Sequence, residues 1–242
     1  MVLSRLRISF TTTSLIKYID LDKHFFQSYV YSCLSDKGDT HLHTGNHFRH
    51  FSFGNPYPSG DLNPGSIKNI LISSPDDDII KKLQDAMEQR GEIWFGKNRV
   101  EILDVKKYNM GIHRAFQTGS PIVLYKNNRN NIYYSLRNGD TLSQLLIRMK
   151  ENSVKRFRDF SGDNGFELNR PLFDLVQFQR EVSTPIQKGN SKFSIIGTTY
   201  YRLERVRINS LETEFYRYLM DGGLGEKTSF GFGFLNPVKE GI

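Results

Sequence analysis

The order of strand-like and helix-like segments is the feature of this sequence that most constrains its fold. Residues 2–10 alternate between apolar and polar side chains, which predicts a strand, and a helical pattern follows over residues 20–34. Further strand-like segments and a second helix extend to residue 107. A similar order of strands and helices recurs roughly 120 residues later, although the two halves share no obvious residue-level repeat. We therefore expect two related units that each combine helices with a sheet.

The clearest helix signal follows a strand-like segment at residues 70–73. Ser74 is expected to be the N-cap and Pro75 the first helical residue. Asp76–Asp78 then occupy the first turn, where carboxylates complement the positive end of the helix dipole. This role explains the three aspartates better than a two-metal site does, because adjacent side chains at a helix start diverge. Gly91 is typical of a helix end, and strands are expected at residues 92–95 and 99–105.

The second half of the chain repeats this order. Strands are expected at residues 121–125, 132–134, 172–181, 193–199, 201–208 and 232–235. Helices are expected from residue 139 to 157 and, with Ser210 as the cap, through residue 220. Residues 108–120 are weakly patterned and could join two domains. The predicted fold is α+β, with two tandem ferredoxin-like (RRM-like, βαββαβ) domains at residues 1–118 and 119–242.

The charge balance favours a polyanionic partner. The 242 residues include 33 Lys and Arg against 26 Asp and Glu, which gives a net charge of +7. Such a balance is typical of proteins that bind nucleic acid or an anionic surface. The single cysteine, Cys33, excludes a disulfide framework and a cysteine-rich zinc site. The absence of a long apolar run and of a secretory signal pattern predicts a cytoplasmic protein with no membrane partner.

Glycines gather near the end of the chain. They stand at Gly222, Gly223, Gly225, Gly231 and Gly233. Glycine allows backbone amides to approach an anion closely, so this segment is expected to contact a phosphate backbone or other segments of the chain. The residues expected to bind nucleic acid here are Gly225, Lys227, Thr228 and Ser229. A tight turn is the alternative. The sequence contains no nucleotide-binding fingerprint, so no cofactor is expected.

A helix, a glycine-rich loop and a short final strand together resemble the RAMP superfamily of CRISPR-associated RNA-binding proteins, with Gly223, Gly225, Gly231 and Gly233 at the glycine positions. The segments Leu42-His43, Phe51-Ser52-Phe53 and Ile72-Ser73-Ser74-Pro75-Asp76 are similar to the pattern of the CRISPR repeat-processing endoribonucleases, the Cas-six family. This resemblance implies metal-independent cleavage of precursor CRISPR RNA within its repeats. The implied products are a 5′-hydroxyl and a 2′,3′-cyclic phosphate.

A non-catalytic RAMP subunit that binds CRISPR RNA in an effector complex is the alternative function. The sequence is compatible both with other subunits of such a complex as partners and with a homodimer.

Five of the six histidines lie at or before position 50: His24, His41, His43, His47 and His50. Imidazole titrates near neutral pH, which suits acid–base chemistry. A metal site and exposed histidines without a role are the alternatives, although the spacing matches no zinc pattern. By the resemblance, His43 matches the catalytic histidine of the family, and His41 could share or replace its role.

Two further residues complete the expected catalytic set. Arg49 stands where the family often has lysine, and its guanidinium offers a planar fork to a phosphate oxygen. Tyr31 corresponds to a tyrosine in the first helix of the family and lies opposite the apolar stripe of that helix. Tyr29 lies nearer that stripe and is expected in the core.

A basic hairpin in the second half is expected to hold RNA, as family members commonly bind the repeat stem there. Its predicted RNA-binding residues are Lys188, Lys192, Arg202 and Arg205. A second basic stretch runs from Arg148 to Arg158 and is expected to be a solvated helix face.

Overall fold

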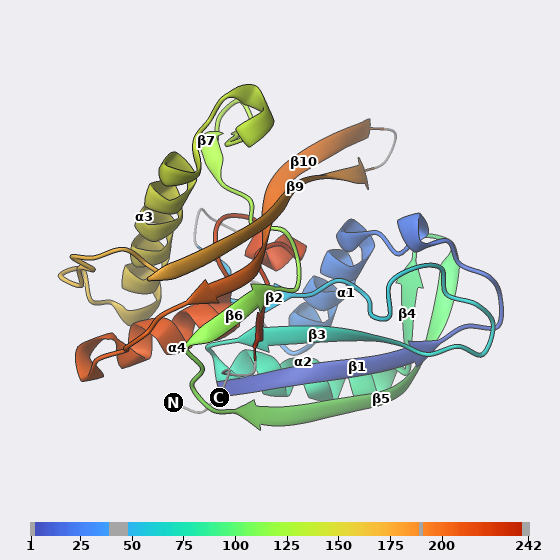
Figure 1. The fold of residues 1–242 in the computed structure, drawn as a ribbon. Helices are drawn as coiled ribbons and strands as arrows, with labels where there is room; N and C mark the ends of the chain where they lie inside the picture. The colour runs from blue at the N-terminus through green and yellow to red at the C-terminus, as the bar shows by residue number, and fades with distance from the viewer. Residues whose placement is uncertain (1–2, 39–47, 189–190, 239–242) are drawn as a thin grey trace.

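The computed structural model describes residues 3–38, 48–188 and 191–238. Figure 1 shows two units side by side, each a sheet with two helices. Within the described ranges, no helix is both long and apolar enough to span a membrane.

The first sheet is antiparallel and has five strands. Its spatial order is β2 (Ser52–Phe53), β3 (Lys68–Ser74), β1 (Leu3–Thr11), β5 (Asn98–Met110) and β4 (Glu92–Phe95). Helix α1 (Lys23–Asp36) follows β1 after a 3-10 turn, η1 (Tyr18–Asp20), and α2 (Asp77–Arg90) follows β3. This is the βαββαβ arrangement, and β4 adds an edge strand to it.

The second sheet has four antiparallel strands. Their spatial order is β11 (Leu235–Pro237), β6 (Ala115–Thr118), β10 (Ser191–Glu204) and β9 (Leu175–Lys188). Its helices are α3 (Leu142–Ser161) and α4 (Thr213–Gly222). A small insertion between β6 and α3 holds β7 (Tyr125–Asn127), β8 (Ile132–Tyr133) and the 3-10 turn η3 (Leu136–Asn138). The 3-10 turns η4 (Ser210–Glu212) and η5 (Thr228–Phe230) flank α4. The prediction of two ferredoxin-like domains is confirmed.

The junction between the domains differs from the expected one. The chain leaves the first sheet at Met110 and enters the second at Ala115, before the expected boundary between residues 118 and 119. Residues 121–124 of the strand expected at 121–125 lie instead in a buried segment outside the named strands, and β7 begins at Tyr125. The buried segment makes single bridges, between Ile122 and Thr198 and between Val123 and Glu226. An unbroken apolar run indicates burial, but it does not specify a strand partner.

Strands β9 and β10 form one long hairpin rather than three separate strands. The expected strands at residues 193–199 and 201–208 merge into β10, which ends at Glu204. The register of the pair shifts between Thr199 and Arg202, so the side-chain alternation is interrupted there. In Figure 1 the far end of this hairpin extends towards α1, and the Gln187 amide donates a hydrogen bond to Asp22.

The helix ends follow local capping rules with small displacements. Asp76, not Ser74, caps α2, because its carboxylate accepts a hydrogen bond from the Asp78 amide. Gly91 ends α2 in the left-handed conformation, as predicted. Asn209 replaces Ser210 as the cap before α4, where its side chain accepts from the Glu212 amide.

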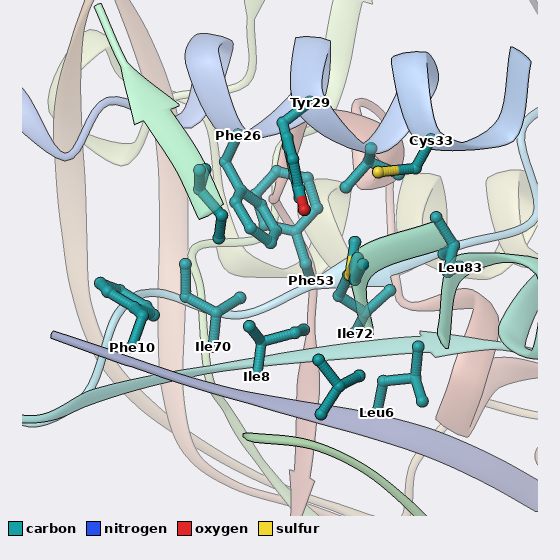
Figure 2. Close-up of a cluster of buried hydrophobic side chains, with 14 of the residues drawn as sticks. Leu6, Ile8, Phe10, Phe26, Tyr29, Cys33, Phe53, Ile70, Ile72 and Leu83 are labelled. Carbon is teal, nitrogen blue, oxygen red and sulfur yellow. The ribbon is translucent and has the colours of Figure 1, made fainter. Parts of the chain in front are cut away.

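The apolar stripe of α1 packs on the first sheet (Figure 2). Phe26, Tyr29 and Cys33 lie over Ile8 and Ile72 of the strands β1 and β3. The expected core position of Tyr29 is thus what the structure shows, and Tyr31 on the other side of the helix is only half-buried.

Candidate active site

The glycine-rich loop after α4 is packed into the junction of the two domains. Gly231 has a positive φ, and a Cβ there would lie 2.2 Å from the Phe53 ring. A Cβ on Gly233 would lie 1.8 Å from the Leu224 carbonyl oxygen. The Gly233 amide donates to the Pro121 carbonyl, 2.8 Å away. These glycines therefore permit close contacts within the protein, the second of the two roles expected of them.

Three cations donate hydrogen bonds to carbonyls along α4 and this loop. Arg156 of α3 reaches the Gly222 oxygen at 2.6 Å, Arg5 of β1 reaches the Met220 oxygen at 2.7 Å, and Lys23 of α1 reaches the Gly231 oxygen at 2.6 Å. Two of these carbonyls belong to the C-terminal turn of α4, where the helix dipole favours positive charge. Arg156, part of the basic stretch expected to be solvated, is buried.

Sequence reasoning did not single out Lys23. Burial of its ammonium group lowers the pKa of Lys23 to about 7. The same group also donates to the Asn55 side chain at 2.6 Å. A lysine at the first position of a helix carries no sequence signal of such a role, because both of its partners come from distant segments.

Tyr31 meets the glycine-rich loop at the surface of this junction. Its hydroxyl donates to the Ser229 hydroxyl at 3.3 Å, across 198 positions in the sequence. Its ring also packs edge-on against Phe51, with centroids 5.8 Å apart. Tyr31, Ser229 and Phe51 thus converge from α1, from η5 and from the residue just before β2. Two side-chain hydroxyls at a half-exposed position can bind a phosphate or a ribose by hydrogen bonds.

Of the other predicted catalytic residues, the structure describes only Arg49. Arg49 is half-buried and stands two residues before Phe51. His41 and His43 fall within residues 39–47, outside the described residues. Within the part of the chain that is described, no three His, Cys, Asp or Glu side chains form a group that could hold a metal ion.

The basic hairpin presents only part of its predicted RNA-binding set. Lys192 is exposed at the start of β10, and Arg202 is half-buried and paired with Glu204. Lys188 ends β9, and its side chain lies outside what the structure describes.

Arg205 does not fit the expectation of a phosphate contact. Its side chain is 1% exposed and lies 2.6 Å from the Asp174 carboxylate. It also donates to the Pro171 carbonyl. Strand β10 ends one residue earlier, so Arg205 has turned inward from the hairpin surface.

The predicted RNA-binding residues of the glycine-rich loop also include both buried and partly exposed residues. Gly225 is buried against the Val123 carbonyl. Thr228 is 5% exposed and accepts a hydrogen bond from Arg156, so neither residue faces solvent. Lys227 and Ser229 are half-buried, and the Lys227 ammonium lies 5.3 Å from the centre of the Tyr125 ring. Lys227 and Ser229 are therefore the predicted loop residues that remain partly exposed to solvent.

Comparison with protein families gives one matching model, described as CRISPR associated protein Cas6, C-terminal, over residues 103–237. Among curated proteins, the chain is 33% identical over 240 residues to CRISPR-associated endoribonuclease Cas6 2 of Methanocaldococcus jannaschii. That alignment covers 97% of this chain and 100% of the relative. A putative CRISPR-associated endoribonuclease-like protein, Cas6nc, of Pyrococcus horikoshii is 24% identical over 180 residues, covering 71% of this chain and 69% of that protein.

Solved structures share the fold at low sequence identity. A CRISPR associated protein Cas6 matches with a TM-score of 0.70 and 17% identity, covering 98% of this chain and 100% of that one. An RAMP protein binding different RNA substrates matches with the same TM-score and coverage at 18% identity. A Cas6 product complex matches with a TM-score of 0.64 and 14% identity, again over 98% of this chain and 100% of that one.

Proposed function

This chain belongs to the Cas6 family, and from that premise we propose that it is an endoribonuclease that cuts precursor CRISPR RNA within its repeats. The observation that carries the proposal is the convergence of Tyr31, Ser229 and Phe51 at the domain junction. In the sequence, Phe51 comes eight residues after His43, and Arg49 stands between them. The chain thus attaches groups suited to proton transfer and to phosphate binding to a residue that contacts this junction.

The proposed reaction uses the RNA itself as the nucleophile. A 2′-hydroxyl loses its proton to a base and attacks the adjacent phosphorus, which forms the P–O2′ bond. The P–O5′ bond breaks, and the leaving oxygen takes up a proton to become a 5′-hydroxyl. The other product is a 2′,3′-cyclic phosphate. The step needs no metal ion and no external nucleophile.

We assign the proton transfers to the histidines. His43, with His41 as the alternative, acts as general base or acid, because imidazole exchanges protons near neutral pH. Arg49 donates to the phosphate oxygens and stabilises the additional negative charge in the transition state. The Tyr31 and Ser229 hydroxyls orient the scissile phosphate. In this assignment the domain junction supplies binding and orientation, while the histidine segment supplies the acid–base chemistry.

The remainder of the RNA is proposed to follow the basic hairpin. Lys188 and Lys192 lie at the end of the hairpin that approaches α1, and Lys227 lies in the glycine-rich loop. Together with the net charge of +7, they favour contacts with a phosphate backbone. The same surface would serve a non-catalytic RAMP subunit in an effector complex, so cleavage itself has to be measured.

The test uses purified protein, end-labelled cognate repeat RNA and excess EDTA. We expect cleavage with a 2′,3′-cyclic phosphate end, while an RNA with a 2′-deoxy residue at the cut site binds but stays intact. Loss of activity in EDTA that magnesium restores would contradict the proposed chemistry. Tight binding without cleavage of either RNA would instead indicate the non-catalytic subunit.

A further inference from the structure

His50 joins the two domains through both nitrogens of its ring. Its Nε2 lies 3.1 Å from a carboxylate oxygen of Asp159 in α3, and its Nδ1 lies 3.1 Å from the Tyr218 hydroxyl in α4. A carboxylate only accepts hydrogen bonds, so Nε2 carries the ring proton and donates to Asp159. Nδ1 is then the acceptor for the Tyr218 hydroxyl. Both hydrogen bonds cross from the first domain to the second.

Packing fixes this side chain further. Its ring lies edge-on to Phe160 and to Tyr218, with centroids 5.2 and 5.7 Å apart. The His50 carbonyl accepts a hydrogen bond from the Ser74 hydroxyl at 2.7 Å. The side chain is only 17% exposed. His50 is therefore held by β3, α3 and α4 together.

The surroundings of His50 also set its charge. Burial and the nearby Arg156 guanidinium lower the pKa of His50 to about 4, although the Asp159 and Asp76 carboxylates act in the opposite direction. The ring is neutral at neutral pH, and its two nitrogens are already occupied. It is thus suited to holding a position rather than to transferring protons.

Two residues close to His50 in the sequence, Arg49 and His43, have catalytic roles in the proposed function. Arg49 is adjacent, with its Cα about 3.8 Å away across one peptide bond. His43 is seven residues earlier in the sequence, and seven residues of extended chain can span ~25 Å. Phe48 gives a second contact with α3, since the Lys155 ammonium lies 5.7 Å from the centre of its ring. Anchoring at His50 therefore acts most directly on Arg49.

We propose that His50, through Asp159 and Tyr218, is a positioning residue for RNA cleavage that holds Arg49 in place at the domain junction. The proposal rests on the proposed endoribonuclease function. It assigns a role to a histidine that makes no contact with the reacting atoms. It also explains why Phe48 and His50, on either side of Arg49, both contact helices of the second domain.

The test is a double-mutant cycle between His50→Leu and Arg49→Ala, measured as single-turnover cleavage at saturating RNA. His50→Leu keeps a similar volume but removes both hydrogen bonds. Misplacing a group by about 1 Å can slow a reaction ~100-fold, so we expect His50→Leu to slow cleavage roughly 10–100-fold. The RNA dissociation constant should change less than about twofold. Because His50 acts through Arg49, the double variant should cleave no more slowly than Arg49→Ala alone.

Two gentler variants keep the test informative if His50→Leu folds poorly. Tyr218→Phe removes a single hydroxyl and should slow cleavage in the same direction. Asp159→Asn retains an acceptor oxygen for Nε2 and should lose less activity than Asp159→Ala. A wild-type rate in folded His50→Leu, or in Tyr218→Phe together with Asp159→Ala, would overturn the proposal.

Other outcomes separate this proposal from the function on which it rests. Fully multiplicative effects of His50→Leu and Arg49→Ala would show that His50 does not act through Arg49. A wild-type rate in Arg49→Ala would likewise overturn the positioning role while leaving the nuclease assignment intact. Wild-type protein that binds repeat RNA without cutting it would overturn the proposed function itself.

Discussion

Arg5 in β1 and Asp221 in α4 form an ion pair that is buried on both sides. The guanidinium lies 3.2 Å from the carboxylate, and the two side chains are 1% and 0% exposed. Arg5 also donates to the Leu235 carbonyl and lies 4.8 Å from the centre of the Phe234 ring. This one side chain therefore joins the first sheet to α4 and to the final strand of the second.

Removal of Arg5 should destabilise the whole protein. Arg5→Met leaves a buried carboxylate and two carbonyls without their donor, and breaking such a pair costs about 3–5 kcal/mol of unfolding free energy. Urea denaturation at pH 7 measures this loss. Arg7→Met is the matched control, because Arg7 is on the same strand and its pair with Asp104 is about half exposed. We expect a loss below about 1 kcal/mol there. Equal losses in both variants would contradict the assigned role of Arg5.

His50 should make the stability depend on pH. Its pKa is about 4 in the folded protein and near 6.5 when unfolded, so the unfolded chain binds the proton more readily between these values. The contribution of this residue is fully present above pH 6.5 and is lost as the pH falls towards 4, by about 1–3 kcal/mol. Urea denaturation of the wild type and of His50→Gln over this range measures it. A constant difference between their unfolding free energies would refute the prediction.

His41 and His43 should affect the cleavage rate rather than the affinity for RNA. We expect His43→Ala to slow single-turnover cleavage by about 10²–10⁴-fold, the usual contribution of a general acid or base. The RNA dissociation constant should change little, since a neutral imidazole contributes little to backbone binding. The double variant at His41 and His43 tests whether His41 substitutes. If that variant cleaves at the wild-type rate, neither imidazole is catalytic, and the roles of Tyr31 and Arg49 have to be re-examined.

The exposed end of the hairpin should account for part of the salt dependence of RNA binding. Lys192→Gln should weaken binding and reduce the slope of log K against log salt by roughly 0.7–0.9, the effect of one lost phosphate contact. Lys81→Gln is the control, because Lys81 is exposed on α2 of the first domain, away from the hairpin. An unchanged slope in Lys192→Gln would place the RNA elsewhere on the protein.

Much of the fold was predictable because its signals are local. The alternation in β1, the apolar stripe of α1 and the left-handed Gly91 after α2 each depend on neighbouring residues. The glycine pattern and the element order also sufficed to indicate the family. The site was less predictable. The sequence pointed to Tyr31 and Ser229 separately, and only the folded chain brings their hydroxyls within 3.3 Å of each other.

The sequence by itself determined the helices and strands, their order and the chemical groups available for RNA cleavage. The tertiary structure decided which of those groups are accessible at the surface. The sequence predicts a solvated Arg156 and an RNA-binding Arg205, yet both are buried against internal acceptors. The physical reason is that the residues next to an arginine or lysine in the sequence do not show whether its side chain will be solvated or buried. Carbonyls or carboxylates supplied by distant segments make its burial favourable, and they come together only when the two domains pack.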